Sequence, residues 1–215
     1  MDGDHTGLLL DGVTIRLDGR TLVSLTQRVG PGEALTVMGP SGSGKSTLLA
    51  FIAGFLDPAF TAEGRVLVDT QDITAMPAEE RHVGMLFQDP LLFPHMTVAQ
   101  NLAFAIPRAV HGRDARAALV KEALAGVELD GLGERDPDTL SGGQKARVAL
   151  ARVLLSAPRT LLLDEPFSRL DVALRQQMRE LVFAKAKAGG LPVLLVTHDE
   201  ADAEAAGGPV LRIGG

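Results

Sequence analysis

The chain has 215 residues, of which 46% are hydrophobic and 22% charged, and a formal net charge of −6. This predicts one globular domain, or a core with one inserted lobe. The acidic balance argues against a surface that coats nucleic acid, and the lack of cysteine excludes a disulfide framework and a thiolate metal site. Because no apolar run approaches the ~18 residues of a membrane span and MDGDHTG does not resemble a signal peptide, we expect a cytosolic location.

The first part of the chain has the pattern of β-structure. Residues 8–38 alternate in strand fashion and lead through the turn PGE into the apolar strand ALTVM at 34–38. GRVLVDT (64–70) and HVGMLF (82–87) predict two further strands. From 98 to 156 the pattern becomes helical, which predicts an inserted helical lobe.

In this helical stretch we expect Asp114 and Ser141 as N-caps. The last third alternates again, with strands expected at 160–164, 191–198 and 209–213. The intervening helix at 171–190 is expected to be capped by Asp171, and a short helix follows at 199–207. Strands that alternate with helices predict an α/β fold with a mainly parallel sheet and ligands at the carboxyl ends of its strands.

The stretch GPSGSGKST at 39–47 fits the pattern G-x-x-x-x-G-K-[ST], and it lies between a predicted strand and a predicted helix. Its glycines let backbone N–H groups turn inward to cradle phosphates, while Lys45 would contact the β- and γ-phosphates and Ser46 would bind Mg²⁺. A flexible linker is the alternative, but it does not explain the strand and helix. The predicted nucleotide-binding residues are Gly39, Pro40, Ser41, Gly42, Ser43, Gly44, Lys45, Ser46 and Thr47.

RTLLLDEP (159–166) is an apolar strand that ends in two carboxylates. Asp164 is expected to be a second anchor for Mg²⁺. Glu165 is the candidate that orients or deprotonates the attacking water. The alternative is a strand that ends in a capping Asp-Glu pair before proline; the phosphate loop in the same chain favours the catalytic interpretation.

TLSGGQ (139–144) offers a second anion-facing element. Ser141, Gly142, Gly143 and Gln144 lie where a helix begins, so hydroxyl and N–H groups and the helix dipole would face an anion. A flexible turn that caps a helix would explain the local structure, but it would not explain why one chain carries two phosphate-facing elements.

With these motifs, the chain resembles the ATP-binding cassette (ABC) family over nearly its whole length. GPSGSGKST is similar to its Walker A loop, LSGGQ to its signature and LLLDEP to its Walker B strand with catalytic glutamate. Gln88 in FQDPLLFPHMTVAQN matches the Q-loop, SRLD (168–171) the D-loop, and His198 the switch histidine. Six motifs in this order favour the resemblance over chance.

The resemblance implies a P-loop NTPase (RecA-like) core with an antiparallel β-subdomain and an inserted helical subdomain. Residues 1–215 would form one nucleotide-binding domain, with its core at about 1–88 and 157–215 and its helical subdomain at about 89–156.

The resemblance also implies a Mg²⁺-dependent ATPase that works as a head-to-tail homodimer. One subunit's Lys45 loop and the other's Ser141–Gln144 would sandwich each ATP, which explains the two anion sites. Gln88 would contact Mg²⁺ and the attacking water and sense the membrane partner. His198 would contact the γ-phosphate, and Asp171 would link the two sites.

The chain departs from the family where an aromatic residue usually stacks on adenine, because it contains no Tyr and no Trp. Arg16 or Leu17 falls at that place, so guanidinium stacking is one expectation and an exposed strand arginine the other. We therefore predict modest ATP affinity and weak selectivity between bases.

LFPHMTVAQNL resembles ATPase subunits of bacterial solute importers, and the end PVLRIGG leaves no expected room for a regulatory C-terminal domain. The chain looks similar to short importer subunits of poorly defined substrate. We expect separate transmembrane permease subunits, a solute-binding protein in the complex, no nucleic acid, and a peripheral place on the inner face of the cell membrane. The alternative is a non-transport ABC ATPase of DNA repair or translation.

Overall fold

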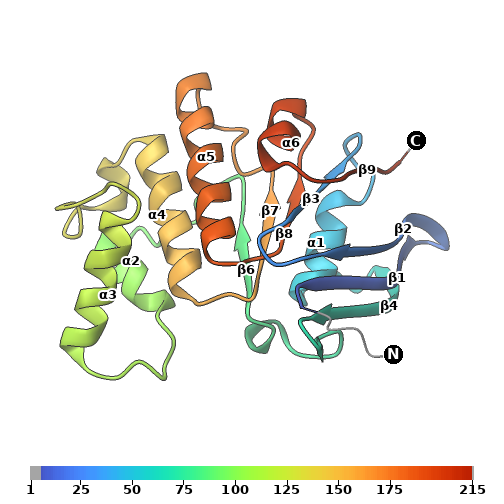
Figure 1. Cartoon of the computed structure of the whole chain (residues 1–215), viewed down its shortest axis with the longest axis horizontal. Helices are drawn as coiled ribbons and strands as arrows, with labels where there is room; N and C mark the ends of the chain where they lie inside the picture. Colours follow the sequence, from blue (N-terminus) through green and yellow to red (C-terminus); the bar gives the residue numbers. More distant parts are fainter. Residues whose placement is uncertain (1–5, 215) are drawn as a thin grey trace. The chain divides into compact units, whose positions relative to one another are not determined.

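The computed structural model describes residues 6–214, and the chain divides into two compact units (Figure 1). The first unit comprises residues up to 85 with 159–165 and 183–215; the second comprises 86–158 and 166–182. Among the described residues, none of the helices has the length and apolar character to cross a membrane.

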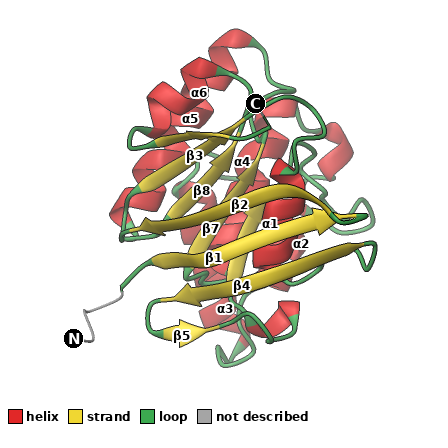
Figure 2. Ribbon diagram, turned by 90° about the vertical axis from the view of Figure 1, so that its right-hand side faces the viewer, coloured by secondary structure: helices red, strands yellow, loops and turns green. Residues whose placement is uncertain are grey.

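The first unit contains an antiparallel sheet in the order β2-β1-β4-β5 (Figure 2). Its strands are β1 (Leu8–Leu17), β2 (Arg20–Val29), β4 (Phe60–Val68) and β5 (Gln71–Asp72). β4 begins four residues before the strand expected at 64–70, because its start pairs with the end of β1, where Leu17 lies opposite Phe60. The sequence around Phe60 carries no strong strand signal, so tertiary pairing extends the strand.

The second sheet has the order β6-β7-β8-β3-β9. Its strands are β6 (Val83–Leu86), β7 (Thr160–Asp164), β8 (Val193–Val196), β3 (Ala34–Met38) and β9 (Val210–Arg212). β3 is parallel to β8 and to β9, and β7 is parallel to β8. The predicted α/β fold with a mainly parallel sheet and an antiparallel subdomain is confirmed.

One hydrophobic core joins the two sheets of the first unit through α1 (Lys45–Ala53). Leu48, Leu49 and Ile52 of α1 are fully buried in it. Residues from β3, β7 and β8 complete the core on one side and residues from β1, β2 and β4 on the other. This packing fixes the loop that precedes α1 against two sheets at once. The unit also holds α6 (Glu200–Ala206) and a 3₁₀ turn, Ala78–Glu80.

The second unit is helical, with α2 (Val98–Ala105), α3 (Arg113–Ala125), α4 (Gly142–Leu155) and the 3₁₀ turn Pro137–Thr139. It also includes the first part of α5 (Val172–Ala188), up to residue 182. Met178 and Val182 of α5 line one cavity with Ala146 and Ala149 of α4, all within this second unit.

The helix caps test three sequence predictions. Ser141 caps α4 in a capping box with Gln144, and Asp171 accepts a hydrogen bond from the N–H of Leu174 at the start of α5, so both predictions are confirmed. The prediction for Asp114 is wrong: α3 begins at Arg113 after Gly112, whose backbone is in the positive-φ region. Asp114 lies in the first turn, where its charge still complements the helix dipole.

Candidate active site

The parallel strands β7, β8 and β3 are neighbours, so their carboxyl ends lie at the same edge of the sheet. The segments that follow these ends carry most of the site residues predicted for the first unit. β3 leads into the loop 39–47, β7 into Glu165, and β8 into the segment that carries His198. The loop, Glu165 and His198 line one cleft with a volume of about 790 Å³. This is the place where open α/β sheets bind their ligands.

Two glycines shape the loop before α1. Gly42 and Gly44 have φ angles of 79° and 91°, which L-residues with a side chain rarely adopt. A Cβ on Gly44 would also lie 2.9 Å from Cγ2 of Val23, so the loop approaches β2 closely. Gly44 is the residue before α1, and residues 39–42 and 44–47 line the cleft at the start of this helix, where the helix dipole favours an anion.

Lys45 is held across this loop. Its side chain is buried to 7% exposure, and Nζ donates to the carbonyl oxygens of Gly39 and Pro40, each at 2.8 Å. The ammonium group is therefore fixed inside the curve of the loop instead of extending into solvent. A buried cation at the start of a helix fits a polyphosphate, because it supplies positive charge to the anion away from water.

Ser46 and Asp164 come together although they are 118 residues apart in the sequence. The Ser46 hydroxyl donates to Oδ1 of Asp164 at 3.1 Å. Burial raises the pKa of Asp164, an effect that the hydrogen bond from Ser46 and the charge of Lys45 oppose and the charge of Glu165 adds to. A half-buried carboxylate beside a hydroxyl is a donor set that suits Mg²⁺, which commonly takes one carboxylate and fills its other positions with water and phosphate.

No cluster of three or more potential metal-ligating His, Cys, Asp or Glu side chains occurs among residues 6–214.

Glu165 is positioned by its backbone. Its N–H donates to the carbonyl of Val196 at 2.9 Å, and its φ of 46° lies in the left-handed region that costs a residue with a side chain energy. Oε1 of Glu165 lies 3.1 Å from Nδ1 of His198. The carboxylate of Glu165 and the imidazole of His198 thus form a pair at the mouth of the cleft.

The segment that carries His198 is fixed by buried polar contacts. The Thr197 hydroxyl donates to Oδ2 of Asp202 at 2.7 Å and accepts from the N–H of Asp199 at 3.1 Å. Thr197 and Asp202 are almost fully buried, whereas the His198 side chain is 66% exposed. The backbone is therefore anchored on both sides of a side chain that faces solvent.

The start of α4 in the second unit is open. Ser141 Oγ accepts from the N–H of Gln144 at 3.2 Å, and Oε1 of Gln144 accepts from the N–H of Ser141 at 3.0 Å. Gly142, the first residue of the helix, is exposed, whereas Gly143 is buried. A Cβ on Gly142 would have no atom within 4 Å, so an external group can approach this backbone closely.

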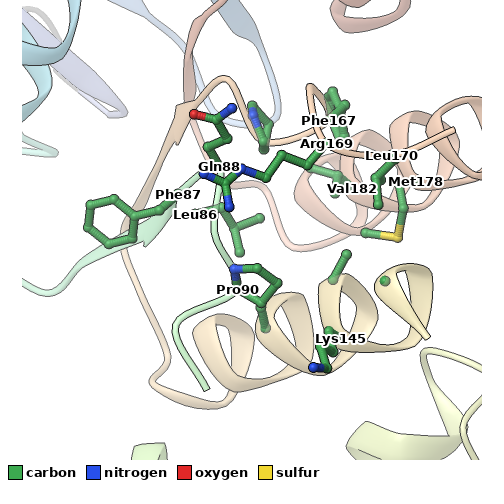
Figure 3. A pocket seen from close by; sticks show the side chains of 14 residues that line it. Leu86, Phe87, Gln88, Pro90, Lys145, Phe167, Arg169, Leu170, Met178 and Val182 are labelled. Carbon is green, nitrogen blue, oxygen red and sulfur yellow. The ribbon is translucent and has the colours of Figure 1, made fainter. Parts of the chain in front are cut away.

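Gln88 lies in the same unit and is exposed at the end of β6. It lines a cavity together with Gly142 and Arg169, and Figure 3 shows the Arg169 side chain extending toward it. The segment after Gln88 is held firmly, because Asp89 pairs with Arg169 and Arg152 donates to the carbonyls of residues 90 and 91.

In the first unit, the loop residues other than Ser43 line one cleft with Glu165 and His198, and Asp164 is hydrogen-bonded to Ser46 of that loop. Gln88, Ser141, Gly142, Gly143, Gln144 and Asp171 lie in the second unit. Of the two residues predicted at the adenine position, Leu17 lines the cleft, and Arg16 forms an ion pair with Glu63 at 2.9 Å. Sequence reasoning missed Leu22 and Phe60, which also line the cleft. Only the strand pairing places them there.

The profile of a family described as ABC transporter matches residues 22–168. The chain is 47% identical to an uncharacterized ABC transporter ATP-binding protein, YnjD, of Escherichia coli K12, covering 92% of this chain and 91% of that protein. It is 51% identical to the thiamine import ATP-binding protein ThiQ of Cereibacter sphaeroides over 80% of this chain and 73% of ThiQ.

A third relative is longer than this chain. The spermidine/putrescine import ATP-binding protein PotA of Vibrio cholerae is 42% identical over 90% of this chain, which spans only 51% of PotA. Together these matches confirm the resemblance predicted from the motifs. They favour transport over the DNA-repair or translation alternative.

Proposed function

This chain belongs to the ABC transporter family and is an ATP-binding, ATP-hydrolysing subunit of such a transporter, and we propose that it powers the import of a solute through separate membrane subunits. The observation that carries the site assignment is the cleft in which Lys45, the Ser46–Asp164 pair and the Glu165–His198 pair meet. These residues provide a positive charge that binds a triphosphate, oxygen ligands for a metal ion, and a carboxylate that orients or deprotonates the attacking water.

In this proposal the loop 39–47 holds the phosphates, and Ser46, Asp164 and Gln88 hold Mg²⁺. Mg²⁺ would neutralise charge on the β- and γ-phosphates. Lys45 contributes a second positive charge near Asp164. The buried Asp164 carboxylate, whose pKa is raised by burial, gains a cation that offsets its desolvation.

Glu165 is the proposed catalytic residue for hydrolysis. Its fixed backbone aims the carboxylate into the cleft, where it accepts a proton from, or orients, the water that attacks the γ-phosphate. His198 sits 3.1 Å from the same carboxylate and presents its other ring nitrogen for a γ-phosphate oxygen. Gln88 would contact the attacking water as well as Mg²⁺.

We propose that the active form is a head-to-tail homodimer. The open N-terminus of α4, with its exposed Ser141 and unobstructed Gly142, supports an anion that comes from a second copy. Each ATP would then be bound by the loop of one copy and by Ser141–Gln144 of the other, with Asp171 linking the two sites. ATP binding would close the dimer and hydrolysis would open it.

Exposed apolar side chains on the second unit support a membrane partner. Phe87, Leu91 and Phe104 are 38%, 55% and 65% exposed, and the ring of Phe104 packs edge-on against Phe93, which follows Leu91 in the chain. We propose that permease subunits dock there, which would place the chain on the inner face of the cell membrane, with a solute-binding protein in the complex. ThiQ and PotA are named for different cargoes at similar identities, so the permease and binding protein would select the solute.

The test traps the assembly with Glu165→Gln, which keeps the shape of the side chain but removes the base. We would express the tagged variant in its native organism, solubilise membranes with Mg-ATP and identify the proteins that co-purify, with Glu165→Gln/Lys45→Ala as the control that cannot bind ATP tightly. We expect a multi-span membrane protein and a binding protein with the single variant only. A soluble repair or ribosomal partner without a membrane protein would refute the transport role.

A further inference from the structure

One end of the antiparallel sheet forms a wall of the nucleotide cleft. β1 ends, and β2 and β4 begin, at the same side of the sheet (Figure 2). Leu17, Leu22 and Phe60 come from these three strand ends, and all three line the cleft that contains Lys45. The wall lies directly beside the phosphate loop, because a Cβ on Gly44 would lie 3.2 Å from Cβ of Leu22.

The strand register explains why these side chains face the cleft. Val13 and Ile15 of β1 are fully buried on the core-facing side, and Leu17 continues the same alternate row. Across the sheet, Phe60 pairs with Leu17 and Ala62 pairs with Ile15, so the Phe60 ring lies on that side too. The row of alternate residues that faces the core thus continues to the end of the strand, where its last side chain forms part of an apolar surface at the cleft.

Phe60 provides the only phenyl ring among the described residues that line the cleft. The ring is partly exposed and rests against the first unit's core, so its base is supported and its outer side is accessible. Arg16, the other candidate for a flat stacking group, is engaged with Glu63. An apolar wall with one supported ring, at the end of a phosphate loop, suits the flat face of a nucleobase.

We propose that Phe60, seated beside Leu17 and Leu22, stacks on the base of the bound nucleotide, an inference that rests on the nucleotide site proposed above. The ring comes from the start of β4 and not from the end of β1, where the resemblance places an aromatic residue. Because a phenyl ring makes no hydrogen bond to a base edge, it stacks on any purine. Phe60 therefore sets affinity for the nucleoside part and does little to distinguish ATP from GTP.

The experiment measures the dissociation constants of Mg-ATP, Mg-GTP and Mg-tripolyphosphate by calorimetry. Tripolyphosphate has no base and reports the phosphate loop alone. The variants are Phe60→Ala, Phe60→Leu and Phe60→Trp, with Phe55→Ala as the matched control, since Phe55 is an exposed phenylalanine of the same unit outside the cleft. Thermal unfolding of each variant shows whether it folds. If Phe60→Ala does not fold, Phe60→Leu removes the ring while it keeps an apolar side chain against the core of the first unit.

Loss of base stacking on alanine substitution predicts an increase of about tenfold in both nucleotide dissociation constants for Phe60→Ala, with tripolyphosphate unchanged. Phe60→Leu should lose part of the affinity, Phe60→Trp should retain it, and Phe55→Ala should match the wild type. Unchanged ATP binding in Phe60→Ala and Phe60→Leu would overturn the inference. An equal loss for tripolyphosphate would do so too, since the ring would then only support the loop. A wild type that binds neither ATP nor tripolyphosphate would instead refute the nucleotide site itself.

Discussion

Ser141→Ala separates the two roles that the start of α4 combines. In the structure, the Ser141 hydroxyl closes one half of a capping box, and in the proposed dimer it also reaches the phosphate of the opposite copy. Thr97 closes an equivalent box at the start of α2 in the same unit, with bonds of 3.2 and 2.9 Å to Gln100. Thr97→Ala is therefore a control that removes the same local bond without touching the predicted anion site.

The two substitutions should cost the same stability. Each removes one hydroxyl acceptor at 3.2 Å and leaves the reciprocal bond from the N-cap N–H to the glutamine in place. Loss of an N-cap costs about 1 kcal/mol, which lowers the unfolding temperature of a chain of this size by roughly 2–4 °C. Thermal unfolding without nucleotide checks that the two variants agree within about 1 °C.

Only Ser141→Ala should weaken the ATP-bound dimer. A hydrogen bond to a charged group contributes about 1.5–3 kcal/mol, or roughly tenfold or more at each site. Because a symmetric dimer has two such sites, we expect the dimer dissociation constant to rise by about a hundredfold. Light scattering after gel filtration, in a Glu165→Gln background with Mg-ATP, measures this constant for both variants. An equal effect of Thr97→Ala and Ser141→Ala, or none from either, would refute the reasoning.

Three further predictions follow from charges and contacts within the first unit. Burial raises the pKa of Asp164, so the folded state disfavours its ionisation and the free energy of unfolding falls as the pH rises above the ordinary pKa of an aspartate. Asp164→Asn should therefore unfold at a higher temperature than the wild type at pH 7, and the difference between their unfolding temperatures should disappear near pH 3. A lower unfolding temperature of the variant at pH 7 would contradict this. Arg81 is buried and donates to four main-chain carbonyls. Arg81→Met should therefore lower the free energy of unfolding, measured in urea, by at least about 3 kcal/mol. A loss below about 1 kcal/mol would show that the carbonyls find other donors. Because the cleft wall at the strand ends is apolar, GTP should bind within about tenfold of ATP, which competition binding tests directly.

The sequence was sufficient to predict elements whose signals are local. Ser141 and Asp171 directly precede helical patterns, and each caps the helix that follows it. In the loop 39–47, glycines stand at the two positions whose φ angles are positive, Gly42 and Gly44. Asp114 failed as a cap because the helix begins at Arg113 after the N-cap Gly112, so Asp114 is the second residue inside the helix and does not precede it.

Phe60 could not be placed from sequence for a different reason. It follows Asp57, whose side chain accepts from the N–H of Ala59 in a turn, and nothing local marks a strand there. Pairing with Leu17, 43 positions away in the chain, extends β4 back to Phe60 and aims its ring at the cleft. The pairing partner lies on a strand that the sequence predicts, but the register between the two strands depends on one bulge between Asp11 and Thr14 of β1, beside Gly64 of β4.

The left-handed backbone at Glu165 has a consequence for how this position can vary. A glycine there would relieve strain of about 1 kcal/mol, and it would lose about as much through the larger freedom of the unfolded chain. Folding is therefore nearly indifferent between the two residues, and a screen for stability alone would let the glutamate drift. Under the role in hydrolysis proposed for Glu165, only selection for turnover would retain the carboxylate, and an ATPase that has become a passive nucleotide binder should lose it first.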